Sequence, residues 1–141
     1  MSDSDALATV TRLLDATNHH DLDGIVGCFD PEYRNETPAH PERGFTGPEQ
    51  VRRNWSAILG GVPDLRATLP AVAVHGDEVW TEWRMAGTRR DGAPHEMAGV
   101  VVFTVRDDRI TAARFYLEPV ERASGTADDA VARLVVAEAR P

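Results

Sequence analysis

The segment Glu32-Tyr33-Arg34-Asn35-Glu36-Thr37-Pro38 says more about this chain than any other. It is polar and has the pattern of a strand that ends in a Pro-rich loop. In an extended strand the side chains of Tyr33, Asn35 and Thr37 share one face, because side chains alternate with period two. Burying a phenol, a carboxamide and a hydroxyl together is costly unless they find partners. These residues therefore indicate a cavity for a small polar ligand or a water molecule, and a solvent-facing edge strand is the alternative.

Helical patterns flank this strand on both sides. The segment before it predicts an amphipathic helix from about residue 4, with an apolar stripe at Leu7, Val10 and Leu14. Asp21 is suited to cap a short second helix. After the strand, Pro48 suits the first turn of a third helix. Its apolar face would consist of Val51, Trp55, Ile58 and Leu59.

Four further strands are predicted at residues 65–74, 78–87, 95–106 and 109–117, separated by short turn signals. Helices followed by a run of strands predict an α+β fold, with helices on one face of an antiparallel sheet. We expect one domain over residues 1–119. Residues 120–141 would form a linker and a C-terminal amphipathic helix, which could cover the barrel mouth, support a dimer or remain mobile.

The chain is acidic, with a net charge of −8 from 23 acidic and 15 basic residues, which disfavours nucleic acid and anionic membranes as partners. The single cysteine, Cys28, lies among apolar residues and is expected in the core. The sequence contains no apolar run of membrane-span length, no signal-peptide pattern, and no motif for a metal, nucleotide or other cofactor. We therefore expect a cytoplasmic protein without metal or cofactor.

Several short stretches together resemble the SnoaL-like branch of the nuclear-transport-factor-two-like superfamily over about residues 5–119. They are Phe29-Asp30-Pro31-Glu32-Tyr33, Gly44-Phe45-Thr46-Gly47-Pro48-Glu49, Pro63-Asp64-Leu65, Gly76-Asp77-Glu78-Val79-Trp80 and Val105-Arg106-Asp107-Asp108-Arg109-Ile110. The resemblance implies a strongly curved sheet wrapped around three N-terminal helices, forming a cone with an apolar pocket. It also implies a homodimer that pairs through the convex sheet. The family scaffold hosts ketosteroid isomerase, limonene-epoxide hydrolase, polyketide cyclases, dehydratases and non-catalytic members, so the fold does not settle the function.

The known catalytic sets of this scaffold are not reproduced in this chain. Tyr33 and Asn35 match the Tyr-x-Asn pair of limonene-epoxide hydrolase, but its Arg and two Asp positions correspond to Trp83, Met85 and Phe115. The general-base Asp of ketosteroid isomerase corresponds to Asn35, which cannot abstract a proton. Its oxyanion-stabilising Asp corresponds to Gly99, and its first-helix Tyr falls near Thr11.

Alternation along the strands, in the register that the resemblance implies, predicts part of the pocket lining, and the third helix and the loop after the first strand would supply the rest. The binding residues would be His40, Trp55, Ile58, Trp83, Met85, Met97, Gly99, Phe103, Phe115 and Leu117. The alternative is that these side chains simply fill the core and leave no pocket. Tyr33, Asn35 and His95 are the candidate catalytic residues. His95 is the candidate for proton transfer because imidazole titrates near neutral pH. Alternation directs His95 inward, but its place beside the turn at residues 90–94 is equally compatible with exposure.

Two functions follow from these observations. The first is a cofactor-free enzyme that cyclises, isomerises, dehydrates or opens an epoxide in a small hydrophobic carbonyl, epoxide or polyketide-type substrate. The second is a non-catalytic module that binds a small molecule or dimerises. The missing carboxylates favour the second, and the inward Tyr, Asn and Thr set favours the first.

Overall fold

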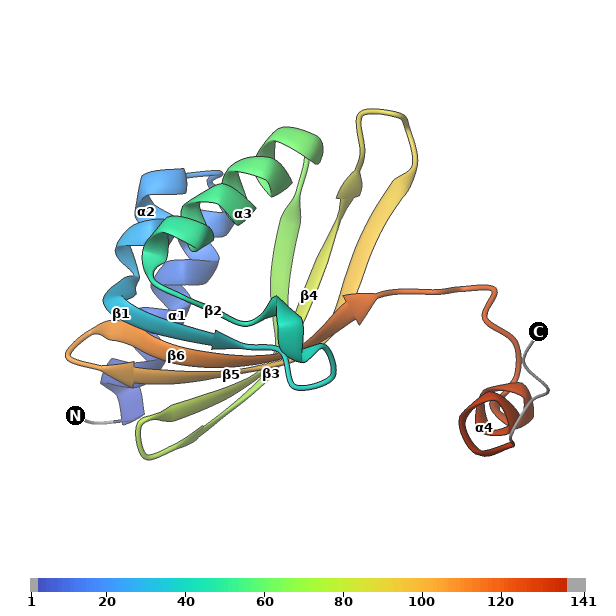
Figure 1. Cartoon of the computed structure of the whole chain (residues 1–141). Coiled ribbons are helices and arrows are strands. Elements are labelled where there is room, and N and C mark those ends of the chain that lie inside the picture. The colour runs from blue at the N-terminus through green and yellow to red at the C-terminus, as the bar shows by residue number, and fades with distance from the viewer. Residues whose placement is uncertain (1–2, 137–141) are drawn as a thin grey trace.

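The computed structural model describes residues 3–136, and Figure 1 shows three helices packed on one side of a curved sheet. The elements run in the order α1 (Asp3–Asn18), α2 (Leu22–Gly27), β1 (Phe29–Glu36), the 3-10 turn η1 (Pro41–Arg43), β2 (Phe45–Thr46), α3 (Pro48–Gly61), β3 (Arg66–His75), β4 (Glu78–Thr88), β5 (Pro94–Arg106), β6 (Arg109–Pro119) and α4 (Ala127–Val135). The expected α+β cone is confirmed.

The sheet is mixed, which corrects the expectation of a purely antiparallel one. The strand order is β2-β1-β6-β5-β4-β3, and β1 pairs with β6 in parallel, with Asn35 opposite Ala113. The other pairs, including the long β3-β4-β5-β6 meander, are antiparallel. The first strand thus lies beside the last, so that only the two-residue strand β2 separates Tyr33 and Asn35 from the edge of the sheet.

Helix α1 packs against the concave face of this sheet. Its most buried apolar side chains are Ala6, Val10 and Leu13, whereas Leu7 and Leu14 are only partly buried. The apolar stripe is therefore centred about one residue away from the predicted one. At the end of α1 the Asn18 carboxamide donates to the carbonyl of Ala67 (2.9 Å) and accepts from its amide (2.7 Å). This pair of hydrogen bonds joins the helix to strand β3.

The loop after α1 and helix α2 follow the local rules of helix capping. Asp21 caps α2 by accepting a hydrogen bond from the amide of Gly24 at 3.0 Å. Cys28, directly after α2, is fully buried, which confirms the prediction that it is a core residue. Its thiol donates to the carbonyl of Gly24 at 3.3 Å.

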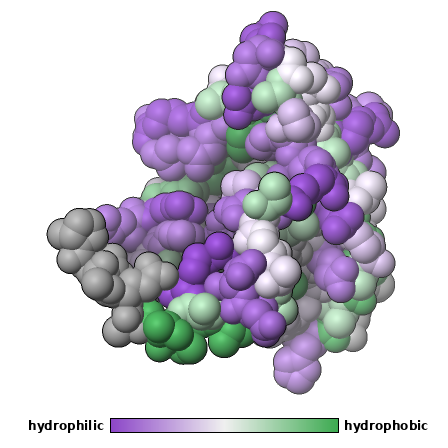
Figure 2. Space-filling model, turned by 90° about the vertical axis from the view of Figure 1, so that its right-hand side faces the viewer, coloured by the Kyte–Doolittle hydropathy of each residue, from purple (hydrophilic) through white to green (hydrophobic). Residues whose placement is uncertain are grey.

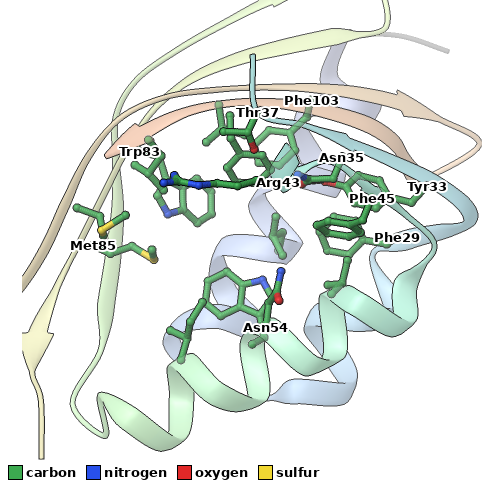
Figure 3. A pocket seen from close by; sticks show the side chains of 18 residues that line it. Phe29, Tyr33, Asn35, Thr37, Arg43, Phe45, Asn54, Trp83, Met85 and Phe103 are labelled. Carbon is green, nitrogen blue, oxygen red and sulfur yellow. Dashed lines mark hydrogen bonds between the residues drawn. The ribbon is translucent and has the colours of Figure 1, made fainter. Parts of the chain in front are cut away.

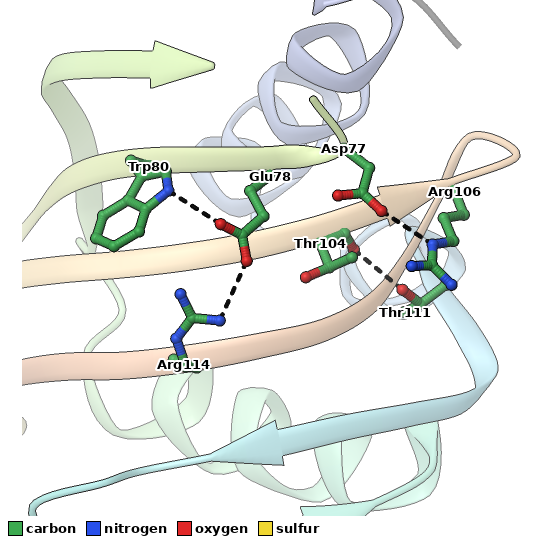
Figure 4. A network of polar contacts seen from close by, with 7 residues as sticks. All are labelled: Asp77, Glu78, Trp80, Thr104, Arg106, Thr111 and Arg114. Carbon is green, nitrogen blue, oxygen red and sulfur yellow. Dashed lines mark hydrogen bonds and ion pairs between the residues drawn. The ribbon is translucent and has the colours of Figure 1, made fainter. Parts of the chain in front are cut away.

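Alternation along the strands separates the two faces of the sheet. In β4, Val79, Thr81, Trp83 and Met85 are buried on the concave side, whereas Trp80, Glu82 and Arg84 are exposed on the convex side. Figure 4 shows the polar network on the convex side, where Arg114 pairs with Glu78 at 3.3 Å. The Arg114 guanidinium also lies 5.6 Å from the Trp80 ring centroid. These contacts cover Val102 on the strand between them.

Helix α4 lies apart from the cone at the end of the segment that follows β6 (Figure 1). Its N-terminus is fixed by a capping box between Thr126 and Asp129. Its apolar side chains are exposed, Leu134 by 83% and Val135 by 72%, and Figure 2 shows hydrophobic residues gathered at this end of the molecule. None of the helices from residue 3 to 136 is both long enough and apolar enough to cross a membrane.

Candidate functional site

A pocket of about 270 Å³ lies between the concave face of the sheet and helices α1 and α3 (Figure 3). This volume is near the lower end of the range that small-molecule sites occupy. The apolar part of its lining comes from α1, β1, β2, α3, β4, β5 and β6. These side chains are Leu13, Phe29, Phe45, Val51, Trp55, Ile58, Trp83, Met85, Met97, Val101, Phe103, Phe115 and Leu117.

At the inner end of the pocket, β1 presents the polar pair that the sequence singled out. Tyr33 is only 1% exposed, and its hydroxyl donates a hydrogen bond to Asn35 Oδ1 at 2.7 Å. The Tyr33 ring makes edge-to-face contacts with Phe29 and Phe45, with centroids 4.7 and 6.0 Å apart. The phenol is thus held rigidly, and it fixes the orientation of the Asn35 carboxamide. With Oδ1 engaged by Tyr33, the Asn35 N–H groups remain as donors for a ligand.

Burial raises the pKa of the Tyr33 phenol well above its usual range, and it also raises the pKa of the Cys28 thiol. The folded protein therefore keeps both protons at pH values where the unfolded chain has released them. The stability that results is complete below the unfolded-state pKa values and is lost as the pH rises through the folded ones.

We expect the free energy of unfolding to fall above about pH 8.5 for Cys28, and additionally above about pH 10 for Tyr33. Each group contributes at most about 1.4 kcal/mol per pH unit. The chain has no lysine, so few other groups titrate in this range. Urea unfolding measures this free energy at a series of pH values from below about 8.5 to above about 10. Tyr33→Phe should abolish the additional loss above pH 10, and an unchanged pH profile in that variant would contradict the assignment.

The remaining polar groups of the pocket are also hydrogen-bond donors. Asn54 on α3 accepts a hydrogen bond from Gln50 through Oδ1 at 2.8 Å, which leaves its N–H groups available. Thr37 contributes a hydroxyl and Arg43 a guanidinium. Among the described lining residues there is no carboxylate and no imidazole. The pocket therefore complements a ligand that is apolar and carries acceptor oxygens.

Most of the candidate residues come together in this pocket. Those that line it are Tyr33, Asn35, Trp55, Ile58, Trp83, Met85, Met97, Phe103, Phe115 and Leu117. Gly99, His40 and His95 do not belong to the lining. Gly99 lies between Trp83 and Leu117 on the neighbouring strands, and its missing side chain lets β5 approach the backbone of β6 closely.

The two histidine candidates lie elsewhere. His40 Nε2 contacts Glu118 Oε1 at 2.7 Å and joins the loop after β1 to β6. His95 lies two residues before Met97 in β5 and pairs with Gly87 on β4. Its Nε2 is buried and has no hydrogen-bond partner within residues 3–136. Alternation assigned His95 to a face of the sheet, but it did not show that the pocket ends before that position.

Two polar lining residues were missed by sequence reasoning. Asn54 had a usable signal, because Val51, Asn54, Trp55 and Ile58 share one helical stripe at spacings of three and four. Arg43 lies in the irregular loop after β1, where no periodicity predicts the direction of a side chain. No group of three or more His, Cys, Asp or Glu side chains that could hold a metal ion occurs in the described part of the chain.

Solved structures with the same fold include proteins assigned to different chemistries. A candidate isomerase from Bacillus subtilis matches with a TM-score of 0.72 and 21% identity, covering 84% of this chain and 90% of its own. A candidate SnoaL-like polyketide cyclase from Jannaschia Sp. CCS1 has a TM-score of 0.70 and 23% identity, covering 82% and 87%. An LEH-like epoxide hydrolase from M. tuberculosis has a TM-score of 0.70 and 21% identity, covering 82% and 84%. At these identities the likeness shows the fold alone.

Among curated proteins, none is similar enough in sequence to match this chain. The model of the SnoaL-like domain family matches residues 10–113, which is more than half of the chain and contains every residue of β1 and most of the pocket lining. The chain therefore belongs to the SnoaL-like domain family.

Proposed function

We propose that this protein is a cofactor-free enzyme of the isomerase or cyclase type, acting on a small hydrophobic carbonyl substrate. The observation that carries the proposal is the hydrogen bond from Tyr33 to Asn35 Oδ1, which holds a carboxamide in place inside an otherwise largely apolar pocket. A candidate isomerase and a candidate polyketide cyclase share this fold, so the scaffold is compatible with this reaction type.

In this proposal the Asn35 N–H groups hydrogen-bond the carbonyl oxygen of the substrate. Negative charge grows on that oxygen when a proton leaves the neighbouring carbon and an enolate forms. A preorganised donor stabilises that charge more than bulk water does, because the donor need not reorganise as the charge forms. Tyr33 positions the carboxamide, and its own proton stays on the phenol because burial disfavours the phenolate.

The absence of a carboxylate or imidazole from the described lining narrows the substrate class. An acceptor for the proton must then be water or a basic atom of the substrate. Such weak acceptors suffice when the C–H bond is already acidic, as it is between two carbonyl groups of a polyketide-type chain or between a carbonyl group and an aromatic ring. Cyclisation or isomerisation of such a compound fits the pocket better than epoxide opening, for which no carboxylate is at hand. His95 has no contact with the ligand in this proposal.

The second candidate is a small-molecule-binding module without catalysis on the same fold. It is favoured by the same lack of a general base among the described lining residues. A binding module would retain a complex with a hydrophobic ketone without changing its rate of enolisation.

Deuterium uptake by 2-tetralone in D2O, followed by NMR, separates the two candidates. We expect the protein to accelerate exchange of the protons next to the carbonyl, with a rate that saturates as the ketone concentration rises. Binding of 2-tetralone without accelerated exchange would support the module instead. If 2-tetralone shows no binding and no accelerated exchange, both the enzyme and the binding module are overturned for ketones of this size.

We also propose that the protein is a cytoplasmic homodimer that pairs through the convex face of the sheet. Trp80 and Tyr116 expose 41% and 43% of their surface there, and aromatic residues of this kind are enriched at protein interfaces. Tyr116→Arg is expected to convert the dimer to a monomer in light scattering. Leu134→Arg on α4 is the matched control and should remain dimeric. Dissociation by the α4 variant alone would place the interface on that helix.

A further inference from the structure

Arg43 is the only charged side chain among the described residues that line the pocket. It is at the end of the short turn η1, and Figure 3 shows its side chain extending across the pocket. Its guanidinium makes no hydrogen bond or ion pair with any residue in the described part of the chain. A cation that faces an apolar cavity without a counter-ion is a complementary site for an anion.

We propose that the ligand of this pocket carries a carboxylate that Arg43 binds, so that the substrate is a hydrophobic keto acid. The guanidinium presents paired N–H donors in a plane, and these match the two oxygens of a carboxylate. A carboxylate also balances the single positive charge of the lining. A phosphate dianion would leave excess negative charge against apolar walls, which is costly.

The loop fixes the backbone of Arg43 before any ligand binds. The amide of Arg43 donates to the carbonyl of His40 at 2.9 Å, and the amide of Gly44 donates to the carbonyl of Pro41 at 3.2 Å. The contact of His40 with Glu118 at 2.7 Å joins the same turn to β6. A backbone fixed in this way reduces the ordering cost of binding.

Asn35 and Arg43 would then bind the substrate at two points. Asn35 comes from strand β1 and Arg43 from the loop, and both side chains face the same cavity (Figure 3). The carbonyl at Asn35 belongs to the proposed function, on which this part of the inference rests. Recognition of the carboxylate by Arg43 can be tested without any turnover.

The test compares 2-naphthoate with 2-naphthamide, which has nearly the same shape but no charge, by isothermal titration calorimetry near neutral pH. Because Arg43 lies at the exposed rim of the pocket, we expect a preference of about tenfold for the carboxylate rather than a hundredfold. Arg43→Gln should remove the preference, and Arg43→Lys should retain part of it. Rising salt should weaken it in the wild type.

Arg106→Gln is the matched control. It removes the same charge from an exposed position where Arg106 pairs with Asp77 at 3.0 Å, so any effect of net charge alone appears there too. Equal binding of the two probes, or binding of neither, would overturn the inference, as would a preference that survives in Arg43→Gln. Tighter binding of 2-naphthyl phosphate than of 2-naphthoate would overturn the choice of a carboxylate.

The two proposals fail in different ways. If the protein prefers the carboxylate through Arg43 and yet fails to accelerate exchange in 2-tetralone, that result supports this inference and contradicts the proposed enzymatic function. Accelerated exchange without a carboxylate preference does the reverse, because 2-tetralone carries no acid group.

Discussion

Gly99→Ala is expected to destabilise the protein by at least about 3 kcal/mol, because an added methyl group would collide with backbone atoms of β6. A Cβ at this position would lie 2.0 Å from the carbonyl oxygen of Tyr116 and 2.8 Å from the Cα of Leu117. Neither atom can move as a flexible side chain does, because both belong to the strand that pairs with β5. The sheet would have to open at its centre to accept the methyl group.

Urea unfolding followed by tryptophan fluorescence measures this loss, since Trp83 is buried beside Gly99 in the sheet. Gly60→Ala is the matched control, because nothing lies within 4 Å of a Cβ added there and Gly60 is in the last turn of α3. That variant should gain up to about 1 kcal/mol from helix propensity. If Gly99→Ala unfolds within about 0.5 kcal/mol of the wild type, the close approach of the strands does not depend on glycine.

Gly99 also shows how far the sequence can predict this molecule. Its place on β5 followed from period-two alternation, and the same alternation predicted which side chains of β4 are buried. Alternation assigns a residue to a face, but not to a depth along the strand or to a distance from the next strand. For this reason Gly99 and His95 were expected in the pocket, whereas one lies where two strands nearly touch and the other lies beyond the lining.

Long-range pairing was the second feature that local patterns did not reveal. The four strands of the meander follow one another, so the turns between them predict their neighbours. Strands β1 and β6 are separated by about half of the chain, and their parallel pairing depends on how the helices fill the concave face. The direction of the Arg43 side chain depends on the same tertiary arrangement, because the single turn η1 is too short to show a periodic pattern in the sequence.

The polar pair on β1 was predictable because it needs only the geometry of one strand. Tyr33 and Asn35 are two residues apart, so a strand places them on one face whatever the rest of the sheet does. What the structure adds is the direction of the hydrogen bond from the phenol to Oδ1. This direction changes the expected roles, because Tyr33 becomes a positioning residue and Asn35 becomes the group that meets the substrate.

Asn35→Leu is therefore expected to lower the protein-catalysed deuterium exchange of 2-tetralone by about 100-fold, the effect typical of losing one oxyanion donor. Leucine has the same number of heavy atoms and the same branching as asparagine, so the pocket keeps a similar outline while the donor is lost. Tyr33→Phe retains the ring contacts with Phe29 and Phe45 and should lower exchange by only about tenfold, because the carboxamide remains but loses its anchor. It should also cost about 1–2 kcal/mol of stability, since Asn35 Oδ1 loses its donor.

Asn35→Asp distinguishes a donor from a base at this position. The carboxylate can still accept the hydrogen bond from Tyr33, but it offers no N–H group and carries the same charge as the enolate that forms. If Asn35 acts by donation, this variant must lose as much exchange activity as Asn35→Leu. A hydrogen-bond donor at this position predicts that the aspartate variant is slower than the wild type. A base at this position predicts that it is at least as fast. An aspartate variant as active as the wild type would mean that proton abstraction, and not stabilisation of the oxygen, limits the reaction in this pocket.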